Sequence, residues 1–124
     1  MALIKRKVLV VDDSMFSRMF IINKLKPLSN IEIIQAEDGD LALKKIAKEV
    51  PDCMILDNLM PNKTGIQVLE ELNNNGVEVP TILVTADIQK TVRDRCMELG
   101  ALAFINKPVD GDELMSYVNK ALLQ

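Results

Sequence analysis

Four short polar motifs, each directly after an apolar run, contain the side chains of this sequence that could do chemistry. The first holds the acidic pair Asp12 and Asp13, the second holds Asp57, and the other two hold Thr85 and Lys107. A carboxylate can act as a nucleophile toward phosphorus, while a hydroxyl and an ammonium group can hold phosphoryl oxygens. These residue types together predict phosphoryl transfer to Asp57.

Repulsion among the carboxylates would call for a cation if folding brings them together. Two like charges about 4 Å apart cost roughly 4 kcal/mol at an effective dielectric constant of 20. Three carboxylates face one lysine here, so a single ammonium group cannot balance them. Mg²⁺ prefers oxygen ligands and retains several waters, which suits carboxylates, a backbone carbonyl and a phosphoryl oxygen. We therefore expect Mg²⁺ as the cofactor.

The elements that must position these residues can be located from hydrophobic patterning. Short apolar runs rich in β-branched residues alternate with segments of helical length. Strict alternation predicts an α/β fold, a doubly wound parallel sheet of five strands with helices on both faces and right-handed crossovers. The five runs are residues 8–11, 31–36, 53–56, 81–84 and 101–105.

The segments between these runs show the spacing and the end signals of helices. Apolar side chains recur about every third or fourth residue in three of them. Residues that cap helix N-termini precede four segments, and Gly100 suits a left-handed C-terminal cap. The apolar stripes are Leu43, Ile46, Ala47 and Val50; Ile88, Val92, Cys96 and Leu99; and Leu114, Tyr117, Val118 and Ala121; the caps are Ser14, Asp38, Thr64 and Asp110.

The predicted topology gathers the four motifs at one edge of the sheet. In open parallel sheets, ligands bind beyond the carboxyl ends of the strands, near the point where the strand order reverses. Asp12, Asp57, Thr85 and Lys107 all lie at such ends. We expect them to form one site.

Length and composition favour one soluble globular domain over residues 1–124. The chain is 48% hydrophobic and 27% charged, which argues against disorder, and its net charge is −3 with one basic cluster at residues 5–7. This charge pattern argues against a nucleic-acid partner. No apolar run is long enough for a signal peptide or a membrane span, so we expect a cytoplasmic protein without membrane contacts.

The cysteines and methionines are interpreted as packing residues. Cys53 lies in an apolar run and Cys96 in a helical pattern, and the chain has no histidine to complete a zinc site. Methionine fills irregular gaps in cores, and we expect this role for Met15, Met19, Met54 and Met60 among the seven.

With these motifs the chain resembles the response-regulator receiver domains, and in particular their single-domain CheY type. The matching stretches occur in family order at residues 10–14, 56–61 with Gly65, 84–86 and 104–108, and the resemblance extends over residues 8–122. It implies strand order 2-1-3-4-5 with five helices, the flavodoxin-like arrangement known for CheY. It also implies a phosphorelay protein that catalyses only its own phosphorylation and dephosphorylation.

The resemblance assigns roles to the site residues. Asp57 would accept the phosphoryl group, and Lys107 would neutralise its charge. Asp13, Asp57 and the backbone carbonyl of Leu59 would bind Mg²⁺ directly, while Asp12 would act partly through water. The family also places a cis peptide bond between Lys107 and Pro108.

The resemblance further implies a switch and its partners. Thr85 would move toward the phosphoryl group, and Phe104 would turn inward into the vacated space. The face made by the helix near 88–99, the strand near Phe104 and the last helix from Asp112 would then change. We expect a sensor histidine kinase as donor and a target protein on this face, with a phosphatase as a further candidate partner and chemotaxis as a candidate process.

Two positions depart from the commonest CheY residues. The second residue after the acceptor is Leu59 instead of Asn, and the second after the threonine is Asp87 instead of Glu. We hypothesise that Leu59 shields the phosphoryl group from water and prolongs its lifetime, while Asp87 partly offsets this by holding water. Phe104 also lacks the hydroxyl of the commoner Tyr.

Each motif taken alone has a plainer interpretation. Asp12 and Asp13 could begin a helix, Asp57 could end a strand before a turn, Thr85 could cap a helix, and Lys107 could be a solvated side chain. Phe104, at a strand position, could likewise be an ordinary core residue. Only the joint occurrence of these motifs favours the site.

Other classes of protein share parts of this motif pattern. Phosphohydrolases of the haloacid dehalogenase type also use a strand-end Asp with Mg²⁺, but they place a second Asp where this chain has Leu59, which cannot protonate a leaving group. A flavodoxin-like cofactor binder would need a phosphate-binding loop after the first strand, and none is present. A receiver-like module that works without phosphate stays open. If the chain is complete, its output is expected through protein contacts.

Overall fold

A computed structural model describes residues 5–123 of the chain. Residues 1–4, where the sequence predicts no signal peptide, lie outside the described part, as does residue 124. The described strands form one parallel sheet in the order β2-β1-β3-β4-β5, as predicted. The strands are β1 Arg6–Val11, β2 Ile31–Ala36, β3 Cys53–Leu56, β4 Thr81–Thr85 and β5 Ala103–Asn106.

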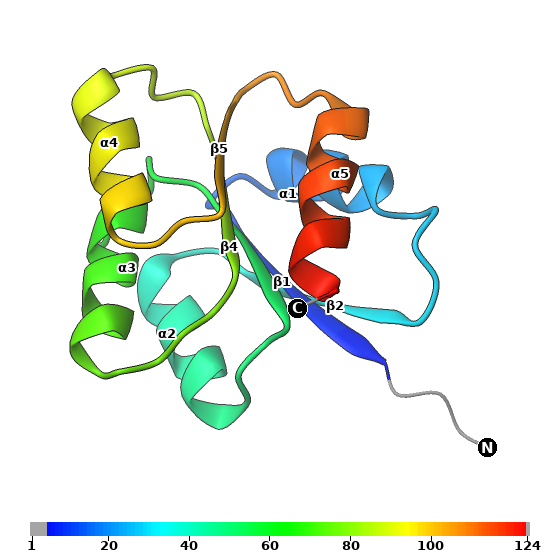
Figure 1. The fold of residues 1–124 in the computed structure, drawn as a ribbon, viewed down its shortest axis with the longest axis horizontal. Coiled ribbons are helices and arrows are strands. Elements are labelled where there is room, and N and C mark those ends of the chain that lie inside the picture. The colour runs from blue at the N-terminus through cyan, green and yellow to red at the C-terminus, as the bar shows by residue number, and fades with distance from the viewer. Residues whose placement is uncertain (1–4, 124) are drawn as a thin grey trace.

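Five helices cover the two faces of this sheet. Two of them, α1 and α5, lie on one face, and the other three lie on the opposite face (Figure 1). The prediction of a doubly wound α/β fold is therefore confirmed. The helices are α1 Met15–Lys24, α2 Gly39–Lys48, α3 Gly65–Asn74, α4 Lys90–Glu98 and α5 Gly111–Leu122. None of the helices within 5–123 is long and apolar enough to cross a membrane.

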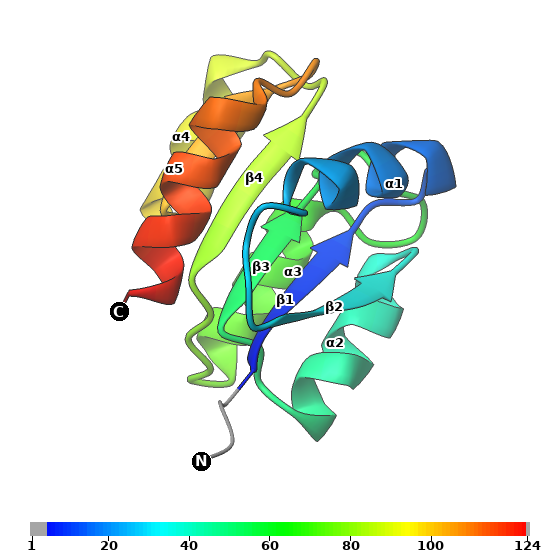
Figure 2. The same cartoon turned by 90° about the vertical axis from the view of Figure 1, so that its right-hand side faces the viewer.

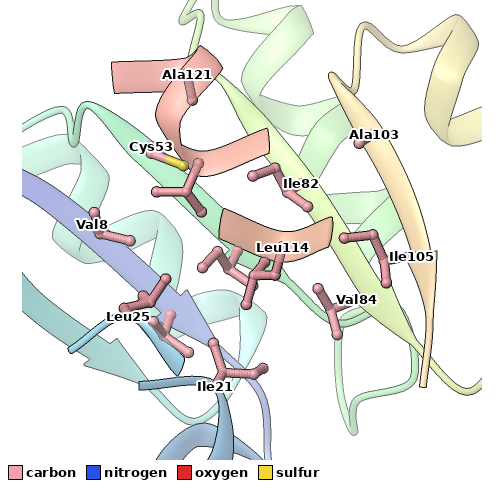
Figure 3. Packing of buried hydrophobic residues seen from close by; sticks show 13 residues of the cluster. Val8, Ile21, Leu25, Cys53, Ile82, Val84, Ala103, Ile105, Leu114 and Ala121 are labelled. Carbon is pink, nitrogen blue, oxygen red and sulfur yellow. The ribbon is translucent and has the colours of Figure 1, made fainter. Parts of the chain in front are cut away.

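The apolar runs alternate between two hydrophobic clusters, which explains why both faces of the sheet are covered. Val8 and Val10 pack on the side of α1 and α5, whereas Leu9 and Val11 pack on the other side. Figure 3 shows the first cluster, with Leu114 of α5 over the central strands. Successive strand side chains point to opposite faces, so a continuous apolar run is required when each face has its own core.

The strand register brings the first two acidic motifs to the same level. Val11 pairs with Leu56, so Asp12 and Asp57 follow directly after paired residues. The strands β1, β3 and β4 run toward a common edge (Figure 2). The strand order and register therefore bring the residues at the strand ends to one edge of the sheet.

The predicted helix caps are confirmed. Four side chains accept hydrogen bonds from backbone amides of the first turns, and Thr64 forms a reciprocal capping box with Gln67. Gly100 follows α4 with φ +97°, the left-handed conformation that favours glycine. The four caps are Ser14, Asp38, Thr64 and Asp110.

Two predicted helical stripes extend beyond the helices. Ile88 lies before α4, which begins at Lys90, and its side chain is 82% exposed. Val50 lies after α2, which ends at Lys48, and is also exposed. Both residues match the helical periodicity, but the backbone is not helical at either position.

The interpretation of the methionines as core residues is wrong for two of them. Met54 is fully buried, but Met15 and Met19 are exposed on α1. Phe16 and Phe20 of the same helix are exposed as well, so α1 presents an apolar surface. Cys53 and Cys96 are both buried and free, as expected.

Candidate functional site

Three carboxylates meet at the carboxyl edge of the sheet. Asp12 follows β1 and Asp57 follows β3, and both are nearly fully buried, whereas Asp13 is exposed. One carboxylate oxygen from each residue lies within 4.8 Å of those of the other two. Within residues 5–123, this is the one cluster of potential ligands of that kind. The first expectation of the sequence, convergence of the acidic motifs, is met.

Lys107, the residue directly after β5, completes the site. Its Nζ lies 2.7 Å from Oδ2 of Asp12 and 3.3 Å from Oδ2 of Asp57. Burial lowers the pKa of Lys107, but the hydrogen bond to Asp12 and the charge of Asp57 outweigh burial, so the pKa lies above the usual lysine value. The peptide bond between Lys107 and Pro108 is cis, as predicted.

The first turn of α1 holds Asp12 in place. The hydroxyl of Ser17 donates to Oδ2 of Asp12 at 2.7 Å, and the backbone amide of Ser14 donates to Oδ1 at 2.9 Å. Arg18 donates to the backbone carbonyl of Asp12 at 2.6 Å. The sequence analysis missed Ser17 and Arg18; their signal is the helix start that follows the acidic pair, which turns one helix face toward the strand end.

Asp57 is fixed by the loop that follows it and by a close helix contact. Its Oδ1 accepts from the backbone amide of Leu59 at 3.1 Å, and its own amide donates to Val11 at 3.0 Å. A Cβ on Gly65, the first residue of α3, would lie 2.7 Å from the carbonyl oxygen of Asp57. Glycine is therefore required there so that α3 can begin directly against the strand end.

Thr85 ends β4 and is fully buried. Its hydroxyl oxygen accepts from the backbone amide of Asp87 at 3.2 Å, and its carbonyl accepts from the amide of Lys107 at 2.9 Å. Thr85 does not cap α4, because the N-cap residue of that helix is Gln89. The plainer interpretation of Thr85 is therefore wrong.

Asn58 is a third residue whose role the sequence analysis missed. It follows Asp57 and is 4% exposed. Its Oδ1 accepts from the amide of Ile66 at 3.0 Å, and its Nδ2 lies 3.4 Å from Oδ2 of Asp87. The one signal in the sequence is its place directly after Asp57; its burial and its partners are seen only in the structure, where a buried amide is normally hydrogen-bonded.

Phe104 and Leu59 lie at the margins of the site. Phe104 is half-buried on β5 and packs against the cluster on the side of α2 to α4. Leu59 is 51% exposed beside Asp57. A hollow of about 410 Å³ next to Phe104 is lined by Ile88, Lys90, Arg93, Asp94, Phe104 and Asn106.

The donor set fits a hard divalent cation. All three acidic side chains offer oxygen, and the exposed position of Asp13 leaves room for retained waters. No buried side-chain nitrogen or oxygen atom in the described part of the chain lacks a hydrogen-bond partner, so the surroundings of the cluster are otherwise satisfied. Such a site suits Mg²⁺ better than a metal that prefers nitrogen or sulfur ligands.

Comparison with known protein families identifies this arrangement. The family model of the response regulator receiver domain matches residues 8–119. The chemotaxis protein CheY of Bacillus subtilis is 31% identical over 116 residues, which are 94% of this chain and 97% of that protein. A protein-glutamate methylesterase/protein-glutamine glutaminase of Koribacter versatilis is 39% identical over 87% of this chain, but the chain spans only 30% of that protein.

Solved structures agree with the sequence relatives. The response regulator domain of CheB from Thermotoga maritima superimposes with a TM-score of 0.85 at 26% identity, covering 97% of this chain and 98% of that one. The receiver domain of the Francisella response regulator 1452 gives a TM-score of 0.87 at 29% identity, covering 96% and 98% of the two chains. Both similarities extend over nearly the whole of each molecule.

Proposed function

The chain belongs to the response-regulator receiver domain family, and from this premise we propose that residues 1–124 form one receiver that accepts a phosphoryl group on Asp57. The proposed donor is the phosphohistidine of a sensor kinase, and the proposed site of action is the cytoplasm. The observation that carries the proposal is the cluster of Asp57 with Asp12, Asp13 and Lys107 at one strand edge.

In the proposed reaction, a carboxylate oxygen of Asp57 attacks the phosphorus of the donor. A P–O bond to Asp57 forms while the P–N bond to the donor histidine breaks, and the leaving imidazole takes up a proton. The ammonium group of Lys107, within 3.3 Å of Asp57, balances charge on the transferred group. The hydroxyl group of Thr85 donates a hydrogen bond to another phosphoryl oxygen.

The acidic residues have a second task. Asp13, Asp57 and the carbonyl of Leu59 would hold Mg²⁺ directly, and Asp12 would hold it partly through water. When bound, Mg²⁺ supplies positive charge to the phosphoryl oxygens and relieves repulsion among the carboxylates. Ser17 and Arg18 keep Asp12 oriented toward this position.

The output face is proposed to comprise α4, β5 and α5. Movement of Thr85 toward the phosphoryl group would let Phe104 turn inward, and the hollow beside Phe104 would change shape. Phosphorylation thereby biases a two-state arrangement toward one that a target protein binds. A phosphatase is a further proposed partner, and chemotaxis is the proposed process because one relative named for it, the chemotaxis protein CheY of Bacillus subtilis, matches 94% of the chain.

A protein donor is favoured by the surface next to the site. Phe16 and Phe20 of α1 are exposed and line an apolar groove of about 330 Å³ that also contacts Lys107 and Pro108. Exposed apolar patches of this kind mark contacts with other proteins. The methylesterase activity in the name of one relative belongs to that protein, and it is not part of the proposal.

Intact mass spectrometry tests the proposal directly. The wild type and Asp57→Asn are incubated with acetyl phosphate and Mg²⁺, with and without a chelator. We expect the wild type alone to gain one phosphate, about 80 Da, and only in the presence of Mg²⁺. A gain in Asp57→Asn equal to that of the wild type would contradict the assignment.

The strongest alternative is a receiver-like binding module that works without phosphate. It predicts no gain of mass with acetyl phosphate or with phosphohistidine donors. A phosphohydrolase of the haloacid dehalogenase type would instead release phosphate continuously from added monoesters. The exposed, apolar Leu59 at the position of that family's acid disfavours the enzyme.

A further inference from the structure

Asp87 connects the ends of three strands. Its carboxylate lies 3.4 Å from the side-chain amide of Asn58 after β3, and its backbone amide donates to the hydroxyl of Thr85 in β4. Its backbone carbonyl accepts from the side chain of Asn106 in β5 at 3.1 Å. Asp87 is only 8% exposed. The residue is therefore a junction inside the molecule and not a surface acid.

The carboxylate of Asp87 is poorly compensated for a buried charge. Within the described residues, its oxygens accept only from neutral donors, the amide of Gln89 at 3.0 Å and Nδ2 of Asn58 at 3.4 Å. The second distance exceeds the usual N–H···O length of about 2.9 Å. A shorter distance would strengthen this hydrogen bond, because a buried carboxylate gains more from a close donor than from a distant one.

Asn58 is held on the side of α3 by two hydrogen bonds. Its Oδ1 is held by the amide of Ile66, and its backbone carbonyl accepts from the amide of Gly65 at 3.1 Å. Asp87, by contrast, is bonded to Thr85, the residue proposed to move toward the phosphoryl group. Any shift of Thr85 toward Asp57 would carry Asp87 toward the fixed amide of Asn58.

We infer that Asn58 and Asp87 form a clasp that is stretched in the unphosphorylated protein and closes when Asp57 carries a phosphoryl group. Asn58 is then a positioning residue, which acts on Thr85 through Asp87. The bond from the Asp87 amide to the Thr85 hydroxyl leaves the hydroxyl hydrogen to point at the phosphoryl oxygen. This inference rests on the proposed function of Asp57.

An exchange of the two side chains tests the clasp. Asp87→Asn would place an amide donor against the amide donor of Asn58, and Asn58→Asp would place two carboxylates together. The double variant Asn58→Asp with Asp87→Asn restores one donor and one acceptor without a change in net charge. The readout is the dissociation constant of Mg²⁺-beryllofluoride, a phosphoryl analogue, measured by fluorine NMR, together with the thermal midpoint without ligand.

Asp87→Asn separates the clasp from simple electrostatics. Removal of a negative charge near an anion site should tighten binding of the analogue if only charge mattered. The clasp predicts the reverse, a dissociation constant raised about tenfold, with recovery to within about threefold of the wild type in the double variant. Asp87→Ala removes the acceptor without adding a donor and should also weaken binding of the analogue. This variant replaces Asp87→Asn in the test if Asp87→Asn does not fold.

Asn73→Asp is the matched control. Asn73 also links two segments, since its Nδ2 donates to the carbonyl of Leu99 at 3.2 Å, but it lies away from the site. We expect this control to bind the analogue as the wild type does. Unchanged or tighter binding by the Asp87 variants, or no recovery in the double variant, overturns the clasp and leaves the proposed function intact. A wild type that binds neither the analogue nor phosphate ends the proposed function and the clasp with it.

Discussion

Leu59 contacts Asp57 in one way and is hypothesised to act on it in another. Its amide holds an oxygen of Asp57, while its side chain remains half exposed above the strand end. The amide contact would be kept with any residue other than proline at this position, whereas shielding from water would depend on the side chain. The two roles of Leu59 can therefore be separated by substitution.

We predict that Leu59→Asn shortens the lifetime of the phosphorylated protein. A polar amide can hold a water molecule near the phosphoryl group, whereas an apolar side chain would exclude that water. We therefore expect phosphate loss to accelerate about tenfold. The measurement is the decay of the phosphorylated mass after removal of acetyl phosphate. Val50→Asn is the control, because Val50 is 52% exposed at the opposite edge of the sheet. An unchanged decay in Leu59→Asn would remove the shielding hypothesis.

The two cysteines are predicted to be unreactive in the folded protein at pH 8. Burial raises the pKa of Cys53 to about 12, and burial together with the charge of Asp87 raises that of Cys96 to about 11. The thiolate is the nucleophile, so iodoacetamide should modify both residues only after addition of urea, which mass spectrometry detects. Prompt alkylation of either residue without urea would contradict the burial.

The same shifts predict a loss of stability in alkali. The pKa of each thiol is higher in the folded state than the unfolded value of 9.0. Their contribution to the free energy of unfolding is therefore present in full below pH 9.0. As the pH rises from 9.0 toward about 12, the unfolded thiols ionise first and the free energy of unfolding falls. Urea titrations of the wild type and of Cys53→Ala across this range should converge as the pH rises.

Residue type and order were enough to predict which acids converge, but not what holds them. Asp12, Asp57 and Lys107 could be found because each follows an apolar run. Ser17 and Asn58 were missed, because a serine in a helix and an asparagine in a loop are common without any such contact, and their positions alone are weak signals. Their roles depend on side-chain directions at the strand ends, which a one-dimensional pattern does not contain.

At the scale of elements, the errors have local physical causes. The strand predicted to begin at Ala101 begins at Ala103, because the amide of Ala101 donates to the carbonyl of Cys96 and closes the end of α4. Ile88 fits a helical stripe, yet the junction at Asp87 keeps residues 87–89 outside the helix. Periodicity detects neither kind of competing hydrogen bond.

The start of α3 gives a prediction at this scale. Gly65→Ala should lower the free energy of unfolding by about 2 kcal/mol, because its Cβ would meet backbone atoms of Asp57 and Asn58 at 2.7 and 2.9 Å. Gly111→Ala is the control at the same position of α5, where the three atoms nearest to the Cβ all belong to the flexible Lys24 side chain, the closest at 3.0 Å. Urea denaturation measures both, and equal losses would contradict the argument.

At the scale of the whole molecule, the fold could be predicted because both faces of the sheet need apolar strands. Val8 and Leu9 serve different cores, so the run that contains them had to be continuous. The apolar surface of α1 was not predicted, because exposed Met15 and Met19 have the same pattern as buried residues. Patterning records which residues are apolar, and only the packed structure shows which of them remain uncovered.

The site also influences the stability of the entire molecule. Asp13 is exposed and adds a third negative charge beside Asp12 and Asp57, with one lysine in contact. Asp13→Asn should therefore be more stable than the wild type in chelator, by a few tenths to about 1 kcal/mol at low salt. Equilibrium urea denaturation measures this difference.

Saturating Mg²⁺ should reverse the order of the two proteins. A cation that binds only the folded state stabilises it roughly in proportion to the logarithm of its concentration over the dissociation constant, and Asp13→Asn would lack one of the proposed ligands. Glu78→Gln removes an exposed charge near the start of β4, at the opposite edge, and should respond to Mg²⁺ as the wild type does. If Asp13→Asn gained as much stability from Mg²⁺ as the wild type, Asp13 would not be a ligand. The crossover therefore separates a cation site from a merely repulsive cluster of acids, because repulsion alone predicts the first difference but not its reversal.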